Sequence, residues 1–242
     1  MHKTELKLDY SLCENKGEMP VIVVAAGSSS RMQGTNKQLV ELGGIPVIAR
    51  TLLKFENCKS ISNIILVVRC EDLFQMQLLC EKYMITKLTD IVCGGNSRQE
   101  SVLNGFSRLP DNTDKVLIHD GARPFVSDEI INSVIDGLDK CNAVTCAVKV
   151  KDTIKQVDKD GRVVKTVNRE NLVSVQTPQG VKVGEYLKAV ENINVAQFTD
   201  DTSIMEAAGN EVFVVDGSYK NIKITTKEDL FIAEGFLSEV SE

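Results

Sequence analysis

The feature that most constrains the fold is a strand sequence near the start of the chain, Val21-Ile22-Val23-Val24. Four consecutive β-branched residues suit a strand that is covered on both faces, as the strands of parallel sheets are. The strand ends at Ala25-Ala26-Gly27, and three serines, Arg31 and Lys37 follow. Ligands of doubly wound sheets bind beyond the carboxyl ends of the strands, so small residues and two cations here indicate a site for a polyphosphate.

Two common phosphate-binding motifs are missing from this loop. The strand is not followed by G-x-x-x-x-G-K-[ST], and Gly27-Ser28-Ser29-Ser30-Arg31 lacks the spaced glycines of G-x-G-x-x-G. The pattern therefore disfavours a P-loop protein and a nicotinamide-dependent dehydrogenase. A hydrophobic strand that ends in small residues also occurs without any ligand, so this loop alone does not establish a phosphate site.

The composition fits one α/β domain and argues against several other classes of protein. The chain has 242 residues, a formal net charge of −6 and a pI near 5.2, which disfavours generic binding of nucleic acid. No stretch approaches the roughly 20 apolar residues of a membrane span, and residues 1–18 carry charges throughout. We therefore expect a cytoplasmic protein with a polar N-terminal extension at 1–18 and a single domain at 19–242.

The cysteines and histidines predict neither disulfides nor a zinc site. Seven cysteines are present without a C-x-x-C pair, several of them inside apolar runs, and His2 and His119 are the two histidines. This usage is typical of reduced structural thiols in a cytosolic protein. A Cys/His zinc site is disfavoured by the same counts. We expect His119 to be structural, because it precedes a carboxylate rather than facing a nucleophile.

Strand and helix patterns alternate along the first 150 residues. Buried strands are expected at Ile61–Val68, Lys115–His119 and Ala143–Val150, with a short one at Ile91–Val92. Helical patterns between them are Ile45–Phe55, Glu71–Tyr83, Asn96–Leu109 and about Ser127–Leu138, and three more helices and two strands are expected after residue 183. The alternation predicts an α/β fold: a Rossmann-like, mostly parallel sheet flanked by helices.

Residues 151–175 break this rhythm. Asp160-Gly161 separates two segments of alternating polarity, which is a hairpin signal, so we expect a protruding β-hairpin arm at about 150–176. An isolated two-stranded ribbon is marginal, and a second subunit would bury its edges. We therefore predict a homodimer through the arm; a solvated hairpin is the alternative.

Three predicted strand ends carry small or charged residues. The first is Ala25–Gly27 with Arg31 and Lys37, the second Gly94-Gly95 with Arg98 and Ser101, and the third Asp120-Gly121-Ala122-Arg123. Each could be turn chemistry alone, but their recurrence at one edge of a sheet favours a ligand site. The glycine pair would let the backbone approach a flat ligand such as a nucleobase.

Several of these residues are ambiguous when they are taken singly. Asp120 could hold a divalent ion that bridges phosphates, because Mg²⁺ needs only one or two protein carboxylates, or it could pair with Arg123. Arg98 could contact the base or cap the helix that it begins. Lys223 lies between two strand-forming isoleucines and Arg169 at the base of the arm, and each could face a site or solvent.

At this point the chain resembles the 2-C-methyl-D-erythritol 4-phosphate cytidylyltransferases of the non-mevalonate isoprenoid pathway. The resemblance runs from about residue 20 to 238. Its motifs, in the family's order, are AAGSSSRM with NKQ, GGNSRQESV, HDGARPF, KDT, VNRENL with QTPQ, TDDTS, and NIKIT. Ser29 and Asn36 depart from a glycine and a proline that are frequent in the family, which affects the stiffness of the loop rather than its charges.

The resemblance implies a fold, a reaction and a set of site residues. It implies a Rossmann-like domain with Mg²⁺ as cofactor, acting on CTP and 2-C-methyl-D-erythritol 4-phosphate in a homodimer. The residues implied to hold the cytidine half of CTP are Ala25, Ala26, Gly27, Gly95 and Ser101. Those implied to be catalytic are Arg31, Lys37 and Lys223. Those implied to contact methylerythritol phosphate are Asp120, Ala122, Arg123, Thr153, Arg169, Thr177 and Thr199.

The chemistry agrees with these residue types. The nucleophile is a phosphate oxygen that is already ionised at neutral pH, so the site needs no catalytic histidine or cysteine. The difficulty is to bring two anions together and to stabilise charge at phosphorus, which fixed cations achieve. Two alternatives remain open: the same reaction on ribitol 5-phosphate, and a non-catalytic nucleotide-binding domain.

Overall fold

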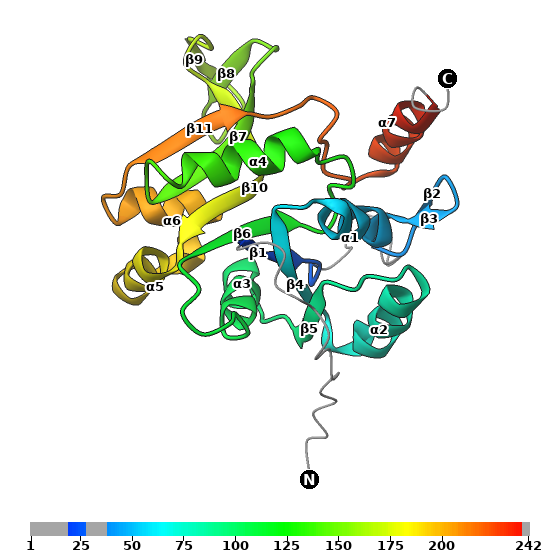
Figure 1. Ribbon diagram of the computed structural model, residues 1–242. Helices are drawn as coiled ribbons and strands as arrows, with labels where there is room; N and C mark the ends of the chain where they lie inside the picture. The colour runs from blue at the N-terminus through cyan, green and yellow to red at the C-terminus, as the bar shows by residue number, and fades with distance from the viewer. Residues whose placement is uncertain (1–18, 28–37, 239–242) are drawn as a thin grey trace.

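One seven-stranded sheet forms the centre of the molecule (Figure 1). The structure, a computed structural model, describes residues 19–27 and 38–238. The order of the strands across the sheet is β11-β7-β10-β6-β1-β4-β5. Their bounds are β1 Met19–Val24, β4 Ile61–Val68, β5 Leu88–Cys93, β6 Lys115–Asp120, β7 Ala143–Lys149, β10 Val173–Lys182 and β11 Val212–Asp216.

The sheet is parallel except at β10, which runs antiparallel to both β6 and β7. The predicted mostly parallel sheet is therefore confirmed. Its register aligns the strand ends that the sequence singled out, because Val24 pairs with Val67 on one side and with Asp120 on the other. The chain after β1 and the turn after β6 consequently leave the same edge of the sheet side by side.

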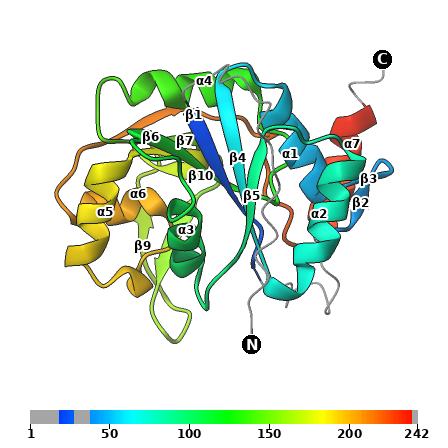
Figure 2. The same cartoon turned by 60° about the horizontal axis from the view of Figure 1, so that its bottom comes forward.

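Helices cover both faces of the sheet (Figures 1 and 2). On one face lie α1 Val47–Asn57, α2 Leu73–Lys82 and α4 Asp128–Gly137, and on the other lie α3 Arg98–Phe106, α5 Val183–Asn192 and α6 Asp201–Ala207. Along β1 the side chains alternate between the two cores: Val21 and Val23 pack under the first set of helices and Ile22 under the second. Burial on both faces explains the uninterrupted β-branched run of this strand.

A smaller core lies where the last helix meets a short hairpin. Helix α7 Lys227–Ser238 packs near β2 Glu41–Leu42 and β3 Ile45–Pro46, around Leu42, Val47, Ile224 and Ala233. The first predicted helix therefore begins at Val47 rather than Ile45, because Ile45–Pro46 pairs with β2. The expected strand at Ile222–Ile224 does not form. This segment instead bonds to the turn after β6, through Ile224 N–H to Ala122 O at 2.9 Å.

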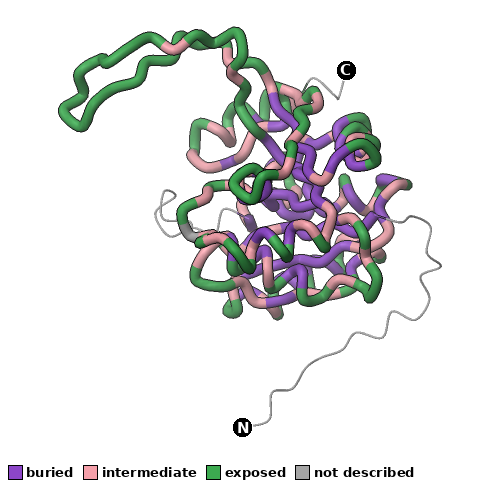
Figure 3. The backbone as a smooth tube through the Cα atoms, turned by 90° about the vertical axis from the view of Figure 1, so that its left-hand side faces the viewer, coloured by how far each residue is buried: buried purple, intermediate pink, exposed green. Residues whose placement is uncertain are grey.

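The predicted arm projects from the body as a two-stranded ribbon (Figure 3). Its strands are β8 Ile154–Val157 and β9 Val163–Val167, which pair in antiparallel fashion, with Gly161 at φ +80° in the turn. Val157, Val163 and Val164 are each more than half exposed. Strand β11, expected as a core strand, is an edge strand whose Phe213 and Val214 are also half exposed.

The prediction that all cysteines are free thiols is wrong for one pair. Cys70, in the 3₁₀ turn Cys70–Asp72 after β4, forms a disulfide with Cys93 at the end of β5. Neighbouring parallel strands bring the two residues together, with their Cα atoms 4.8 Å apart, a spacing that sequence positions do not reveal. Cys80 and Cys146 are buried thiols as expected, and burial raises the pKa of each to about 12. No described helix has the length and apolar character needed to cross a membrane.

Candidate active site

A cavity of about 410 Å³ opens at the carboxyl edge of β1, β5 and β6. This is the edge at which ligands of open α/β sheets bind. The three predicted strand ends converge on it, together with Gln38 and Lys223. The described residues that line it are Val24, Ala26, Gly27, Gln38, Gly95, Asn96, Ser97, Arg98, Ser101, Asp120, Ala122 and Lys223.

The loop between β5 and α3 approaches β1 closely because two of its residues are glycines. A Cβ on Gly94 would lie 2.3 Å from the Cβ of Ala26, and a Cβ on Gly95 would lie 2.3 Å from the Cβ of Glu100. Both separations are far inside van der Waals contact, so a larger residue at either position would push the loop out of place. The glycine pair therefore lets this loop pack closely against β1 and α3, and its approach to a flat ligand stays a prediction.

Side chains at the start of α3 fix the shape of this loop. Ser101 Oγ accepts from Gly95 N–H at 3.1 Å and donates to Ser97 O at 2.8 Å. Ser97 caps the helix by accepting from Glu100 N–H at 3.0 Å, and Glu100 in turn accepts from Asn96 N–H at 2.7 Å. This reciprocal capping satisfies amide groups that the first turn of a helix leaves open. Ser101 thus holds Gly95 toward the cavity.

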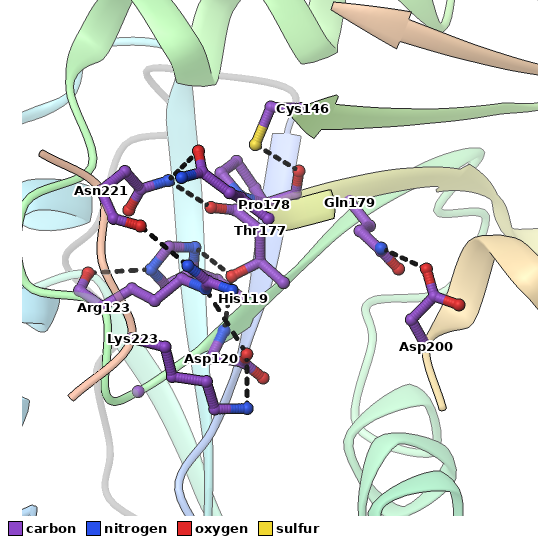
Figure 4. Close-up of polar contacts among 12 residues, drawn as sticks. His119, Asp120, Arg123, Cys146, Thr177, Pro178, Gln179, Asp200, Asn221 and Lys223 are labelled. Carbon is purple, nitrogen blue, oxygen red and sulfur yellow. Dashed lines mark hydrogen bonds and ion pairs between the residues drawn. The ribbon is translucent and has the colours of Figure 1, made fainter. Parts of the chain in front are cut away.

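Asp120 is the centre of charge in the cavity wall (Figure 4). Lys223 Nζ lies 2.8 Å from Oδ2, Arg123 Nε lies 3.6 Å from the same oxygen, and Arg98 Nε lies 3.6 Å from Oδ1. Burial by itself would raise the pKa of Asp120, but the three cations outweigh it and hold that pKa well below the usual range. The carboxylate is therefore ionised, and the cations around it leave a net positive charge beside the cavity.

Arg98 connects this cluster to α6. The sequence left open whether it contacts the base or caps its helix, and the family resemblance did not include it among the site residues. Its Nη2 donates to Asp201 Oδ2 at 2.7 Å, and the fully buried Asp201 also accepts from Tyr186 Oη at 3.0 Å. Burial lowers the pKa of Arg98, yet the two nearby carboxylates, those of Asp201 and Asp120, more than reverse this shift. Nη1 of Arg98 is buried without a hydrogen-bond partner among the described residues. The sequence feature that pointed to Arg98 as a site residue was its position three residues after Gly95.

The structure brings some predicted substrate residues to this cluster and leaves others away from it. Arg123 and Thr177 pack beside Asp120 but do not line the cavity. Thr199 is exposed just before α6, and Thr153 and Arg169 are exposed at the base of the arm, where Arg169 Nη1 donates to Lys151 O. Arg31 and Lys37, two of the three predicted catalytic residues, lie outside the described residues.

A magnesium ion fits this site through a single carboxylate. Among the described residues that line the cavity, Asp120 is the acidic one, and no group of three His, Cys, Asp or Glu side chains that could hold a metal occurs in the described parts of the chain. A Mg²⁺ held mainly by phosphate and water oxygens requires only one or two protein carboxylates. Asp120 would hold such an ion, which would offset charge on bound phosphates.

The fold and the cavity together define a class of protein. A mostly parallel sheet, a glycine-containing loop that shapes a pocket at its carboxyl edge, and cations beside that pocket are the parts that a nucleotidyltransferase needs.

Comparison with known proteins identifies the family within this class. A sequence model of the family 2-C-methyl-D-erythritol 4-phosphate cytidylyltransferase matches residues 19–239. A relative of that name from Clostridium tetani is 44% identical over 245 residues, which cover 99% of this chain and 96% of the relative. Another from Clostridium novyi is 46% identical over 226 residues, 90% of this chain and 96% of that protein. The chain therefore belongs to the 2-C-methyl-D-erythritol 4-phosphate cytidylyltransferase family.

Solved structures agree with this assignment. The crystal structure of 4-diphosphocytidyl-2C-methyl-D-erythritol synthase from Anaerococcus prevotii superposes with a TM-score of 0.81 at 35% identity, covering 94% of this chain and 99% of that one. The cytidylyltransferase from Francisella tularensis superposes with a TM-score of 0.74 at 34% identity, covering 90% and 98%. The family, the fold and the enzyme class expected from the sequence are confirmed.

Proposed function

We propose that the cavity described above transfers CMP from CTP to 2-C-methyl-D-erythritol 4-phosphate. An oxygen of the acceptor phosphate forms a bond to the α-phosphorus of CTP, and the bond from that phosphorus to the oxygen bridging to the β-phosphate breaks. The products are 4-diphosphocytidyl-2-C-methyl-D-erythritol and diphosphate. The attacking oxygen is ionised at neutral pH, so no proton has to be removed from it.

The observation that carries this proposal is the charge cluster around Asp120. Arg98, Arg123 and Lys223 lie within 3.6 Å of its carboxylate. Arg98, Lys223 and Asp120 itself line the cavity, together with several small residues. Fixed cations in a partly desolvated site stabilise charge that develops in a transition state without reorganising. A substrate with several phosphates and a phosphorylated acceptor suits this surplus of positive charge.

The CTP half of the cavity consists of backbone and small side chains. Ala26, Gly27, Gly95 and Ser101 line the cavity, so a flat base would meet backbone and small side chains there. In this proposal the residues that hold cytidine are Ala25, Ala26, Gly27, Gly95 and Ser101. The catalytic cations are Arg31, Lys37 and Lys223.

The acceptor half is formed around Asp120 and, in the proposed homodimer, by the arm of a second subunit. Within one chain the proposed contacts to the acceptor are Asp120, Ala122, Arg123, Thr177 and Thr199. Thr153 and Arg169 are exposed at the base of the arm and do not line the cavity of their own chain. The exposed valines of β8 and β9 give the ribbon an apolar surface that a second copy would cover. The arm would then bring Thr153 and Arg169 to the partner's cavity.

Magnesium and the location in the cell complete the proposal. Asp120 is the carboxylate that would hold Mg²⁺, which supplies Lewis-acid stabilisation to the phosphates when it is bound. We also place the protein in the cytoplasm, as its sequence suggests. The Cys70–Cys93 disulfide opposes this location, since cytosolic thiols are usually kept reduced. Alkylation of thiols in intact cells decides the matter: labelling of both cysteines supports a reducing compartment, and protection of both excludes it.

One assay tests the reaction. The purified chain with Mg²⁺ and CTP should release diphosphate with 2-C-methyl-D-erythritol 4-phosphate as acceptor, and much more slowly with ribitol 5-phosphate. Faster release of diphosphate with ribitol 5-phosphate would show that ribitol 5-phosphate, and not 2-C-methyl-D-erythritol 4-phosphate, is the acceptor. If no diphosphate is released with 2-C-methyl-D-erythritol 4-phosphate and none with ribitol 5-phosphate, the chain would be a non-catalytic nucleotide-binding protein. Omitting Mg²⁺ in the presence of a chelator should abolish the release.

A further inference from the structure

The turn that carries Asp120 and Arg123 is fixed through its backbone as well as through its side chains. Most main-chain polar groups from Asp120 N to Arg123 O are hydrogen-bonded, and four of them bond to distant parts of the chain, at Val24, Thr51, Thr177 and Ile224. The contacts are Asp120 N–H to Thr177 Oγ1 at 3.0 Å, Gly121 N–H to Val24 O at 2.9 Å, Thr51 Oγ1–H to Gly121 O at 2.9 Å, Ile224 N–H to Ala122 O at 2.9 Å, Arg123 N–H to Asp120 O at 3.0 Å, and His119 Nε2 with Arg123 O at 3.1 Å.

The contacts at the two ends of this turn meet on the ring of His119 (Figure 4). Nδ1 of the ring lies 3.1 Å from Thr177 Oγ1, which also contacts the amide of Asp120. Nε2 lies 3.1 Å from the carbonyl oxygen of Arg123. His119 and Thr177 therefore join the first and the last residue of the turn in one chain of hydrogen bonds.

The directions of these hydrogen bonds follow from which groups can donate. The Arg123 carbonyl only accepts, so Nε2 of His119 carries the proton and donates to it. The Asp120 amide only donates, so Thr177 Oγ1 accepts from it and donates its own hydrogen to Nδ1. One neutral tautomer thus satisfies every group in the chain. The ring is fully buried, so these two contacts are the hydrogen bonds that its nitrogens make among the described residues.

We propose that His119 is a positioning residue of the transferase: through Thr177 and the Arg123 carbonyl it holds Asp120 and Arg123 in register with Lys223. This rests on the proposed function of the cavity. His119 does not line the cavity, whereas Asp120 does, so the imidazole acts through its neighbours. Displacing a catalytic group by about 1 Å can cost on the order of a hundredfold in rate.

Three substitutions separate the two contacts of the ring. His119→Phe fills the same space and removes both. In His119→Asn the amide lies the same number of bonds from Cβ as Nδ1, so the contact with Thr177 survives. In His119→Gln the amide corresponds to Nε2 and keeps the contact with Arg123. We expect His119→Phe to lose at least about tenfold in kcat and each amide variant to regain part of it.

A comparison of kcat with binding of the nucleoside distinguishes positioning from general damage to the fold. Among the described residues no hydrogen bond or ring contact joins the His119 ring to the loop from Gly94 to Ser101. The Kd of cytidine, which carries no phosphate to meet Lys223 or a metal at Asp120, should therefore stay within about threefold by calorimetry while kcat falls. Phe55→Leu is the matched control, because Phe55 packs edge-on against the His119 ring at 4.9 Å between centroids and makes no polar contact with it. It should lower Tm but keep kcat.

The outcomes are separable. Release of diphosphate by the wild-type protein tests the proposed function. If the wild-type protein releases none, the proposed transferase activity and the role of His119 are both overturned. A His119→Phe variant with wild-type kcat, or one that loses cytidine affinity as much as kcat, would overturn the role of His119 alone. Long-range proton–nitrogen NMR gives a readout independent of activity: a neutral ring protonated at Nε2 at pH 7 supports the assignment, and the other tautomer contradicts it.

Discussion

Lys223 Nζ lies 2.8 Å from Oδ2 of Asp120, and this ion pair joins the segment before α7 to the end of β6. The lysine side chain is 38% exposed whereas that of the aspartate is only 10% exposed. The ammonium can therefore reach a ligand in the cavity while the carboxylate holds it in place. Arg98, at the start of α3, and Arg123, in the turn after β6, lie beside the same carboxylate.

Lys223 is predicted to be essential for turnover. Lys223→Ala should lower kcat by at least about a hundredfold, because removing one preorganised charge from a transition state typically has an effect of this size. Lys37→Ala is expected to behave in the same way. Lys188→Ala is the control, since Lys188 is exposed on α5 and pairs only with Glu185 among described residues. Steady-state release of diphosphate measures all three, and wild-type rates in Lys223→Ala would rule out its role.

Asp120 should make stability depend on pH. The pKa of Asp120 in the folded protein is lowered relative to an unfolded value of about 3.9. The ionised carboxylate therefore stabilises the folded protein above about pH 3.9, and this stabilisation is lost as the pH falls through the folded pKa. Asp120→Asn leaves three cations without their counter-charge. The gap in unfolding free energy between wild type and Asp120→Asn should be largest near pH 7 and narrow below about pH 4. Urea denaturation at a series of pH values checks this, and a constant gap would contradict it.

Gly94 is predicted to be intolerant of a side chain. In Gly94→Ala the new methyl group would meet the Cβ of Ala26 at 2.3 Å, so the loop must move away from β1. We expect CTP affinity to fall by at least about tenfold, since a misplaced loop loses its contacts with the base. Gly235→Ala, within α7, meets nothing within 4 Å and should be neutral or slightly stabilising. Calorimetric titration with CTP and thermal melting compare the two.

The arm should determine the oligomeric state. Val164→Lys places a charge on an exposed apolar position of β9, and it should shift a dimer toward monomers because the charge would be buried at the interface. Phe74→Lys on α2 makes the same kind of change at a residue 72% exposed elsewhere and should leave the dimer intact. Light scattering after size exclusion reports the mass. A monomeric wild type would refute the arm-mediated dimer.

The disulfide between Cys70 and Cys93 predicts a loss of stability on reduction. It closes a loop with a sequence separation of 23 residues, for which the chain-entropy account gives about 3 kcal/mol. Reduced wild type and Cys93→Ser should unfold at similarly lower urea concentrations than oxidised wild type. Mass mapping of maleimide-labelled peptides before and after reductant provides the check. Labelling of both residues without reductant would show that the bond is absent in solution.

The strand ends were predictable from the sequence because their chemistry is local. The β-branched run at Val21–Val24 specifies a strand covered on both faces, and the strand that ends at Asp120 has an equally clear pattern. The strand before Gly94-Gly95 was expected only at Ile91–Val92, whereas β5 extends from Leu88 to Cys93. Parallel strands align their carboxyl ends at one edge. The resemblance to a known family then supplied the expected substrate and the particular residue roles.

Other features were not predictable because they depend on which strands become neighbours. The adjacency of β4 and β5 places Cys70 beside Cys93. The sequence pattern at Ile222–Ile224 predicts a strand. In the structure a hydrogen bond from Ile224 to Ala122 holds this segment in place, and no strand forms there. The position of Arg98 in the sequence suggests a helix-capping or base-binding residue. In the structure it forms ion pairs with Asp120 and Asp201, which lie far from it along the chain.

The sequence by itself determined the alternation of strands and helices, the arm and the residue types at the cavity, because hydrophobic periodicity and turn chemistry act over a few residues. It did not predict β10, the antiparallel strand between β6 and β7. Only the tertiary structure decided which charges meet. Asp120 is surrounded by Arg98, Arg123 and Lys223, and the amide of Asp120 is joined through Thr177 to a neutral His119. The physical reason is that electrostatic and hydrogen-bond energies depend on distances of a few ångströms between groups, and the packing of the sheet and helices sets those distances.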